Sequence, residues 1–220
     1  MDWVAVGVTL KLAALTTGVL AVVGLPLAYW LATSRRAWRP LVDAAVAVPL
    51  LLPPTVLGFY LLMSTGPDTP VGRLYEWVAG GTLPFSFTGV LIASVVYNLP
   101  FAVRPFVAGF AAVDRRLLEA ARCLGASPVR TFRTVVLPLS WPAVLAGLVL
   151  AFAHTVGEFG VVLMVGGNIP GITRTVALAI YDDVQALDYA SAHQASAVLL
   201  VFAVAVLAAT YALQRRTPLT

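Results

Sequence analysis

Apolar residues along the chain fall in long blocks separated by short polar stretches. A helix that crosses the hydrocarbon core of a bilayer needs about 20 predominantly apolar residues, and five blocks have this length. They cover residues 12–32, 41–63, 85–112, 139–165 and 192–213. The pattern predicts an all-α, polytopic membrane protein in which residues 1–220 form a single transmembrane domain with about five membrane-spanning helices.

The amino-acid composition excludes an ordinary soluble domain. Hydrophobic residues make up 60% of the chain and charged residues 11%, whereas soluble domains carry about 25% charged residues. The net charge of +4 does not indicate a nucleic-acid partner, because the basic residues are divided among separate short loops and form no continuous basic face. Membrane lipid is therefore the expected surrounding of the helices.

Lysine and arginine are unevenly divided between the two sets of loops. Positive residues in short loops are retained on the cytoplasmic side of a membrane. Eleven of the 14 basic residues lie at or after the ends of the first, third and fifth predicted helices: Arg35, Arg36, Arg39, Arg104, Arg115, Arg116, Arg122, Arg130, Arg133, Arg215 and Arg216. This distribution predicts an N-terminus outside and a C-terminus in the cytoplasm, and five spans require the same arrangement.

The predicted cytoplasmic loop over 114–136 has the signals of two short helices. Asp114 is placed to cap the first helix, and Gly125 can supply a left-handed ending. Ser127 and Pro128 then form an N-cap and a first-turn proline for the second helix. The apolar face of the first helix needs cover, which either a cytoplasmic partner or the membrane surface could provide.

A spaced motif in this loop carries a family resemblance. Glu119-Ala120-Ala121 is followed after three residues by Gly125, and after nine more by Val135, one residue and Leu137-Pro138. The pattern resembles the EAA loop of binding-protein-dependent ABC importers, with valine in place of the family's isoleucine. The resemblance implies that the loop forms a coupling helix that binds an ATP-binding subunit. The docking residues that it implies are Glu119, Ala120, Ala121, Gly125, Leu137 and Pro138.

Three further segments resemble the molybdate-type permeases of that family. They are 48–58 (VPLLLPPTVLG), 157–160 (GEFG) and 168–175 (NIPGITRT). The resemblance implies a homodimeric permease of the bacterial inner membrane that imports molybdate, with ATP-binding subunits and an extracytoplasmic molybdate-binding protein as partners. Tungstate and sulfate are the alternative substrates, since the first two segments are also similar to sulfate-type relatives.

Prolines and polar residues inside the spans mark a candidate translocation pathway. In the second span they are Pro49, Pro53, Pro54, Thr55 and Gly58. In the fourth span, His154 and Glu158 continue a helical stripe that begins at Gly147 and Ala151, and they could form a local pair. Static packing is the alternative role for any one of these residues. A carboxylate repels an oxyanion, which favours the local pair over direct contact with the substrate. The apolar spans contain few arginines that could bind an oxyanion, so we expect a weak and transient passage.

The predicted outer loop over 166–194 contains Arg174, the candidate contact for the binding protein. Catalysis in this chain has little support, because the one lysine, Lys11, belongs to no phosphate-binding motif and neither histidine has a metal-binding pattern around it. We expect no cofactor here, with Mg-ATP bound by the partner subunit. The alternatives are an intramembrane enzyme that uses His154 and Glu158, which lacks a nucleophile, and a passive channel or scaffold, which needs no coupling loop.

Overall fold

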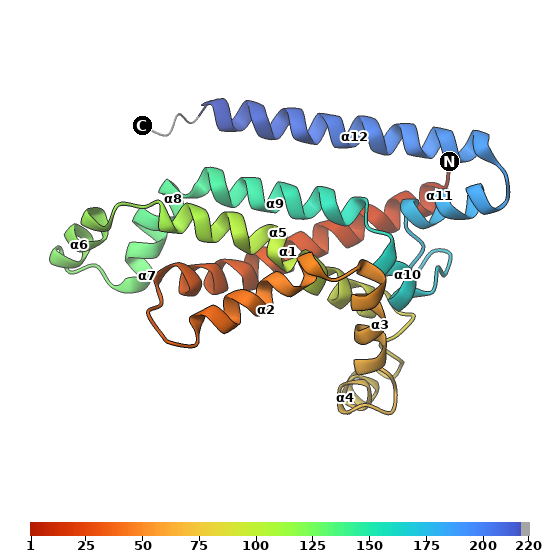
Figure 1. Cartoon of the computed structure of the whole chain (residues 1–220), viewed down its shortest axis with the longest axis horizontal. Helices are drawn as coiled ribbons and strands as arrows, with labels where there is room; N and C mark the ends of the chain where they lie inside the picture. Colours follow the sequence, from red (N-terminus) through yellow and green to blue (C-terminus); the bar gives the residue numbers. More distant parts are fainter. Residues whose placement is uncertain (217–220) are drawn as a thin grey trace.

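The computed structural model describes the backbone of residues 1–216 and the side chains of residues 1–210, and this part of the chain is helical without strands. Long helices run along the long axis of the molecule, with α6 and α7 at one end and α10, α11 and α4 at the other (Figure 1). The elements are α1 (Trp3–Thr33), α2 (Arg39–Leu51), α3 (Pro54–Ser64), α4 (Pro70–Ala79), α5 (Phe87–Ala111), α6 (Arg115–Cys123), α7 (Pro128–Thr131), a π-helix (Phe132–Val136), α8 (Leu137–Leu139), α9 (Trp141–Val156), α10 (Gly160–Gly166), α11 (Val176–Gln185) and α12 (Tyr189–Arg216).

The predicted all-helical membrane fold is confirmed. Three helices, α1, α5 and α12, are long and apolar enough to cross a bilayer. Two bent pairs raise the number to five if each pair counts as one span: α2 with α3, bent by 116°, and Pro128–Leu139 with α9, bent by 75°. Arg215 and Arg216 are two of the basic residues that predict a cytoplasmic C-terminus, and their side chains lie outside the described residues.

Two of the five apolar blocks are broken rather than continuous helices. In the block at 41–63, α2 ends at Leu51 and Leu52 is extended, with φ −84° and ψ 137°. Proline disfavours the α conformation of the residue before it, and Pro53 follows Leu52. In the block at 139–165, α9 ends at Val156 and α10 begins at Gly160. The second break holds the buried residue Glu158, whereas the first is more open, since Leu51 is 85% exposed.

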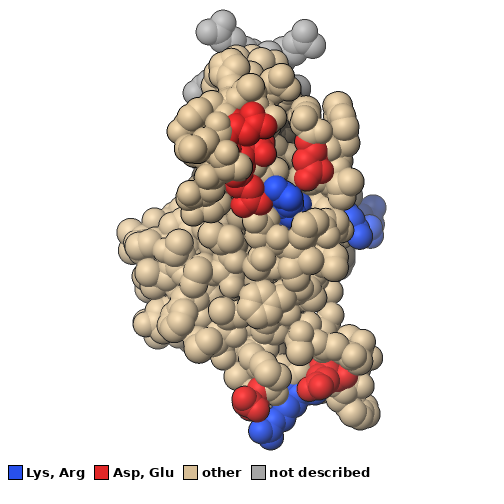
Figure 2. Space-filling view, turned by 90° about the vertical axis from the view of Figure 1, so that its right-hand side faces the viewer, with Lys and Arg blue, Asp and Glu red and all other residues tan. Residues whose placement is uncertain are grey.

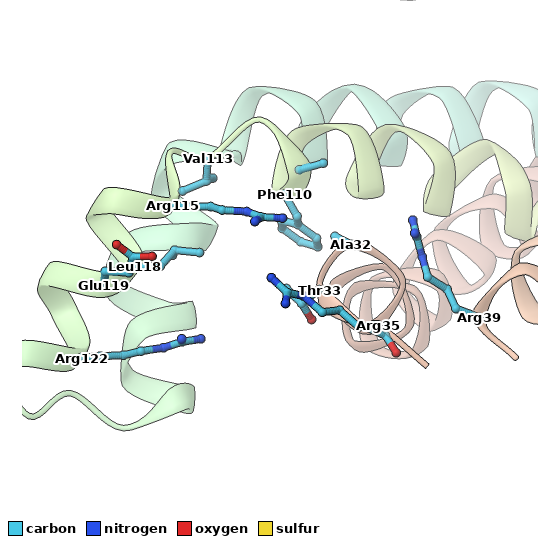
Figure 3. Close-up of a pocket in the computed structure, with 12 residues that line it drawn as sticks. Ala32, Thr33, Arg35, Arg39, Phe110, Val113, Arg115, Leu118, Glu119 and Arg122 are labelled. Atoms are coloured by element: carbon cyan, nitrogen blue, oxygen red, sulfur yellow. The ribbon is translucent and has the colours of Figure 1, made fainter. Parts of the chain in front are cut away.

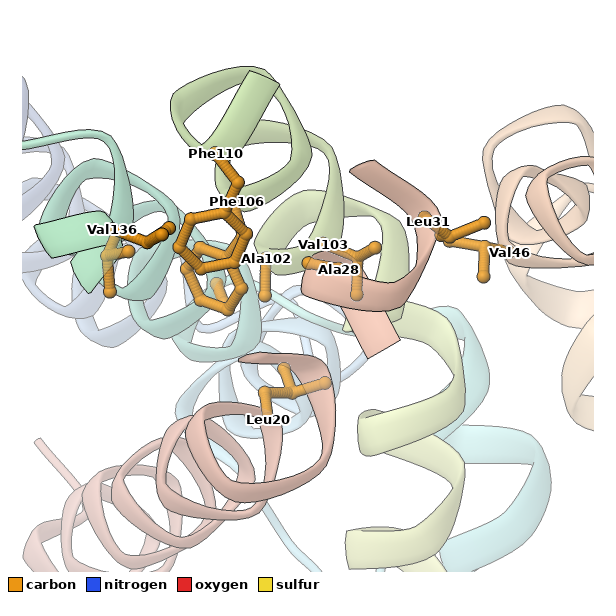
Figure 4. Close-up of a cluster of buried hydrophobic side chains, with 11 residues drawn as sticks. Leu20, Ala28, Leu31, Val46, Ala102, Val103, Phe106, Phe110 and Val136 are labelled. Carbon is orange, nitrogen blue, oxygen red and sulfur yellow. The ribbon is translucent and has the colours of Figure 1, made fainter. Parts of the chain in front are cut away.

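The main core lies where α1, α5 and α9 pack together. Phe106 of α5 is fully buried at its centre, among side chains of α1, α9 and the π-helix (Figure 4). Because lipid tails are as apolar as leucine, helices in a membrane associate by close van der Waals packing, which small residues favour. Gly147 of α9 is such a residue, since an added Cβ would lie 2.8 Å from Phe106 Cε1 and 3.0 Å from the Ala102 carbonyl oxygen.

Replacing Gly147 with alanine is expected to lower the free energy of unfolding by about 1–3 kcal/mol, because the added methyl group overpacks this contact. Gly18 of α1 is the matched control, since nothing lies within 4 Å of its added Cβ. Gly18→Ala is expected to raise the same free energy by about 0.5–1 kcal/mol through helix propensity. Unfolding of the purified variants in detergent measures both. Equal stability of the two variants would mean that α5 and α9 can move apart to accommodate the added methyl group without a loss in the free energy of unfolding.

Candidate functional site

The turn of the loop over 114–136 has the predicted capping. The backbone N–H of Arg116 donates to Asp114 Oδ1 at 2.9 Å, and that of Arg130 donates to Ser127 Oγ at 3.3 Å. Gly125 has a φ of 76°. Its N–H donates to the Arg122 carbonyl, and the next N–H reaches the Ala121 carbonyl, which is the Schellman ending of a helix. Local signals alone therefore account for the shape of this loop.

The residues of the EAA pattern divide into two groups. Glu119, Ala120 and Gly125 are exposed on α6 and its turn, and Ala121 is half-buried. Leu124, which follows α6, is 88% exposed. By contrast, Leu137 packs against the core around Phe106, and Pro138 is the second residue of α8, the short helix before α9. The structure thus places the first group on a surface open to a partner and the second at the junction with the membrane helices.

An aromatic cluster that the sequence pattern did not predict ties this loop to the bundle. The ring of Phe132, in the π-helix, lies 4.8 Å from that of Tyr29 in α1 and 5.6 Å from that of Phe110 in α5. Tyr29 and Phe110 contact each other edge to face at 6.0 Å. These ring contacts pack the loop directly against both α1 and α5.

The second group of candidate residues surrounds the break between α9 and α10. Pro54, Thr55, His154 and Glu158 line one pocket of about 540 Å³, together with Tyr97 and residues of the break. Pro49 is buried in α2, and Pro53 precedes α3. Gly58 lies between α3 and α10, where an added Cβ would be 2.7 Å from Met164 Cβ. Four of the seven candidate pathway residues therefore meet at one place.

His154 and Glu158 do not pair directly. Asn98 of α5 lies between them: its Nδ2 donates to Glu158 Oε2 at 3.0 Å, and its Oδ1 lies 2.9 Å from His154 Nδ1. The expectation of a local pair assumed one continuous helix, but α9 ends at Val156 and Glu158 follows that end. Asn98 itself was visible in the sequence as a polar residue inside the third span, although nothing in its spacing linked it to the fourth.

Glu158 is a buried carboxyl group with incomplete hydrogen bonding. The residue is 4% exposed. Its Oε1 has no hydrogen-bond partner among the described residues. The ring of His154 is stacked on Phe101 at 3.9 Å. Asn98 thus contacts both ionisable groups, and it belongs to α5, which also contacts the loop over 114–136 through Phe110.

Arg174 is held at the opposite end of the molecule by internal contacts. Its Nη2 lies 2.7 Å from Asp182 Oδ2, its Nε lies 3.9 Å from Asp2 Oδ2, and its side chain is 24% exposed. Asn168 donates to the same Asp182 carboxylate at 2.9 Å. Figure 2 shows this end, where acidic residues gather in two groups beside basic residues with an uncharged surface between them. Arg174 therefore has a structural partner in addition to its accessible surface.

Asp188, in the loop before α12, receives hydrogen bonds from the Ser191 hydroxyl and backbone N–H, and these lower the pKa of its carboxyl group. A charged carboxylate at this position caps the first turn of α12.

The family described as "Binding-protein-dependent transport system inner membrane component" matches residues 21–217. The chain belongs to this family. It is a multi-pass permease of the inner membrane, and as a permease subunit it is a transport component rather than an enzyme. This assignment favours transport over the alternative of an intramembrane enzyme acting through His154 and Glu158.

Curated relatives of this permease include transporters of two oxyanions. It is 52% identical to the molybdenum transport system permease protein ModB of Azotobacter vinelandii, over 97% of this chain and 95% of the relative. The ModB protein of Escherichia coli K12 is 40% identical over 84% of this chain and 80% of its own. A probable sulfate transport system permease protein, cysT of Chlorella vulgaris, is 35% identical over 79% of this chain and 65% of its own. The predicted resemblance to molybdate-type permeases is confirmed.

Solved structures of distant permeases have the same fold. A chain of the MetNI methionine ABC transporter in an inward-facing conformation matches with a TM-score of 0.72 at 19% identity, over 99% of this chain and 98% of that one. A chain of the bacterial alginate ABC transporter, solved with a pentasaccharide-bound periplasmic protein, also matches with a TM-score of 0.72. Its identity is 18%, over 97% of this chain and 78% of that one. At this identity the likeness concerns the fold alone.

Proposed function

We propose that this chain is the transmembrane permease subunit of an ATP-driven importer that moves molybdate into the cytoplasm. The observation that carries the proposal is the 52% identity to a molybdenum permease over nearly the whole of both chains. The exposed first half of the EAA pattern supports the ATP-driven part of it, because a separate motor needs an accessible contact on the permease.

In the proposed assembly, two copies of the permease bind two ATP-binding subunits, which hold Mg-ATP, and an extracytoplasmic molybdate-binding protein. The end that carries α6 and α7 faces the cytoplasm, and the N-terminus lies outside. Two features support this orientation. The start of α1 and the end of α12 lie toward opposite ends of the long axis (Figure 1), and the arginines of the predicted cytoplasmic loops gather at the α6 end.

The contacts suggest how the coupling loop acts on the pathway. Movement of α6 passes through Phe132 to Phe110 on α5. The same helix carries Asn98, which holds Glu158 at the break beside Pro54 and Thr55. A packed chain with two discrete arrangements can link two such sites. The pocket offers hydroxyl groups and one histidine but no arginine, so the proposed passage of the dianion is weak and transient.

Uptake by the transporter in liposomes tests the proposal, with the permease, its ATP-binding subunit and the molybdate-binding protein reconstituted together. Molybdate uptake is expected to need ATP, and excess sulfate is expected to compete poorly. Tungstate is expected to compete well, since its size and charge are nearly those of molybdate. Preferred uptake of sulfate would support the sulfate alternative, and uptake without ATP would contradict an importer altogether.

Removal of Arg174 is expected to weaken stimulation by the binding protein more than basal ATP hydrolysis. Arg174→Gln removes both its exposed surface and its ion pair with Asp182. Asp182→Asn is the matched control, because it removes the ion pair, keeps an acceptor oxygen for Asn168 and leaves the Arg174 side chain in place. ATP hydrolysis by both variants is measured with and without binding protein. Loss of stimulation in Arg174→Gln but not in Asp182→Asn supports direct contact, whereas equal loss in both means that Arg174 acts only by shaping the loop.

A further inference from the structure

A second pocket, of about 610 Å³, lies at the α6 end of the molecule (Figure 3). Its walls come from the end of α1, the connection to α2, the end of α5 and one face of α6. On the bundle side the lining is apolar and includes Ala32, Phe110 and Val113, while four arginines line the rest of it: Arg35, Arg39, Arg115 and Arg122. None of these side chains belongs to the pathway described above.

The positive charge of the four arginines has no ion-pair partner within the described residues. Glu119 is the one acidic residue in the lining. Arg39 Nε is buried and has no hydrogen-bond partner in the same part of the chain. Like charges gathered around one space repel each other, so an anion in that space would stabilise the arrangement.

Local structure directs the side chains into this space. Arg115, Glu119 and Arg122 are spaced by four and three residues along α6, which puts them on one face of the helix. Arg35 follows the end of α1 at Thr33. Figure 3 shows Arg35, Arg115 and Arg122 pointing toward the same space from opposite sides. Convergence from two separate elements distinguishes this group from an ordinary solvated row of charges.

We propose that this pocket binds a tetrahedral oxyanion of the phosphate type. The planar guanidinium group matches the oxygens of such an anion with two parallel hydrogen bonds. The anion can be the phosphate of an anionic lipid or a free inorganic ion. The apolar bundle-side wall fits a lipid, because basic pockets between helices on the cytoplasmic side bind anionic lipid headgroups. A bound anion would join α6 to the connection between α1 and α2 and to the start of α2, and so hold the loop over 114–136 against the bundle.

Binding to the purified full-length chain in uncharged detergent tests this proposal. The probes are short-chain phosphatidylglycerol, short-chain phosphatidylcholine, inorganic phosphate and molybdate. The test variant is Arg35→Gln with Arg115→Gln. Its matched control is Arg36→Gln with Arg116→Gln, which removes the same charge from neighbouring positions that do not line the pocket. The single variant Arg122→Gln provides a second measurement if the double variant is poorly folded.

We expect saturable binding of phosphatidylglycerol or inorganic phosphate that the test variant weakens by about tenfold or more, since two charge-assisted hydrogen-bond donors are lost. The control is expected to bind as the wild type does, and Arg122→Gln to bind more weakly. Binding of phosphatidylglycerol alone assigns the site to a lipid headgroup, and binding of phosphate or molybdate as well assigns it to a free ion.

Three results would overturn the proposal: no saturable binding of any charged probe, equal weakening by test and control variants, or equal binding of phosphatidylcholine and phosphatidylglycerol. A test variant that binds the probes normally but no longer retains the ATP-binding subunit would also overturn it, because the arginines would then serve a protein contact.

Discussion

Replacing Asn98 with leucine is expected to lower the free energy of unfolding by about 2–5 kcal/mol. The substitution removes the amide that donates to Glu158 Oε2 and contacts His154 Nδ1. Each buried polar group left without a partner costs about 1–3 kcal/mol, and more if it is charged. Unfolding of the purified permease in detergent measures the change, and nucleotide-dependent uptake is expected to fall as the break between α9 and α10 loses its anchor on α5.

A double-mutant cycle with Glu158→Leu distinguishes this cause from a general packing defect. If Asn98 serves to satisfy Glu158, the double variant should lose less stability than the sum of the two single variants, because leucine at both positions leaves no buried carboxyl group. Additive losses would mean that the 3.0 Å contact between the two side chains contributes nothing.

Replacing Gly125 with valine is expected to reduce ATP-driven uptake by about tenfold or more while the membrane helices still assemble. The φ of 76° at Gly125 is a genuine outlier for a β-branched residue and costs about 1–3 kcal/mol there. The α6–α7 turn can relieve that strain by changing shape, which displaces Glu119 and its neighbours from the partner. Retention of the ATP-binding subunit during purification and uptake by liposomes measure the effect.

Gly125→Asn is the matched control, because asparagine enters the left-handed region far more readily. Nothing lies within 4 Å of an added Cβ at this position, so the two variants differ mainly in backbone preference. Asparagine is expected to keep most of the uptake. If valine were tolerated as well as asparagine, the shape of the turn would be unimportant for coupling.

Local chemistry explains why the sequence predicted the shape of the loop over 114–136 so closely. Asp114, Gly125 and Ser127 each act on backbone groups within a few residues, and each makes the expected contact or conformation. The break at Leu52 also has a local cause, because Pro53 follows it. No proline marks the break after Val156. The stripe from Gly147 to Glu158 was therefore interpreted as one continuous helix.

Contacts between distant helices could not be predicted from the pattern. Asn98 meets His154 and Glu158 across 56 and 60 residues of chain. Arg174 was predicted to be a surface contact, and its ion pair with Asp182 appears only when the loop folds back on α11. The arginines of the α6 pocket were each identified as topological signals, yet nothing in their spacing placed Arg35 opposite Arg115.

The sequence by itself determined that this chain is a bundle of membrane helices with a capped loop over 114–136. Hydrophobic length and capping residues act locally, and both are readable along one dimension. The tertiary structure alone decided which polar side chains meet inside the bundle and which arginines share a pocket. These contacts depend on how far each helix is rotated about its axis and how deep it lies against its neighbours. Close packing between separate helices determines the rotation and the depth.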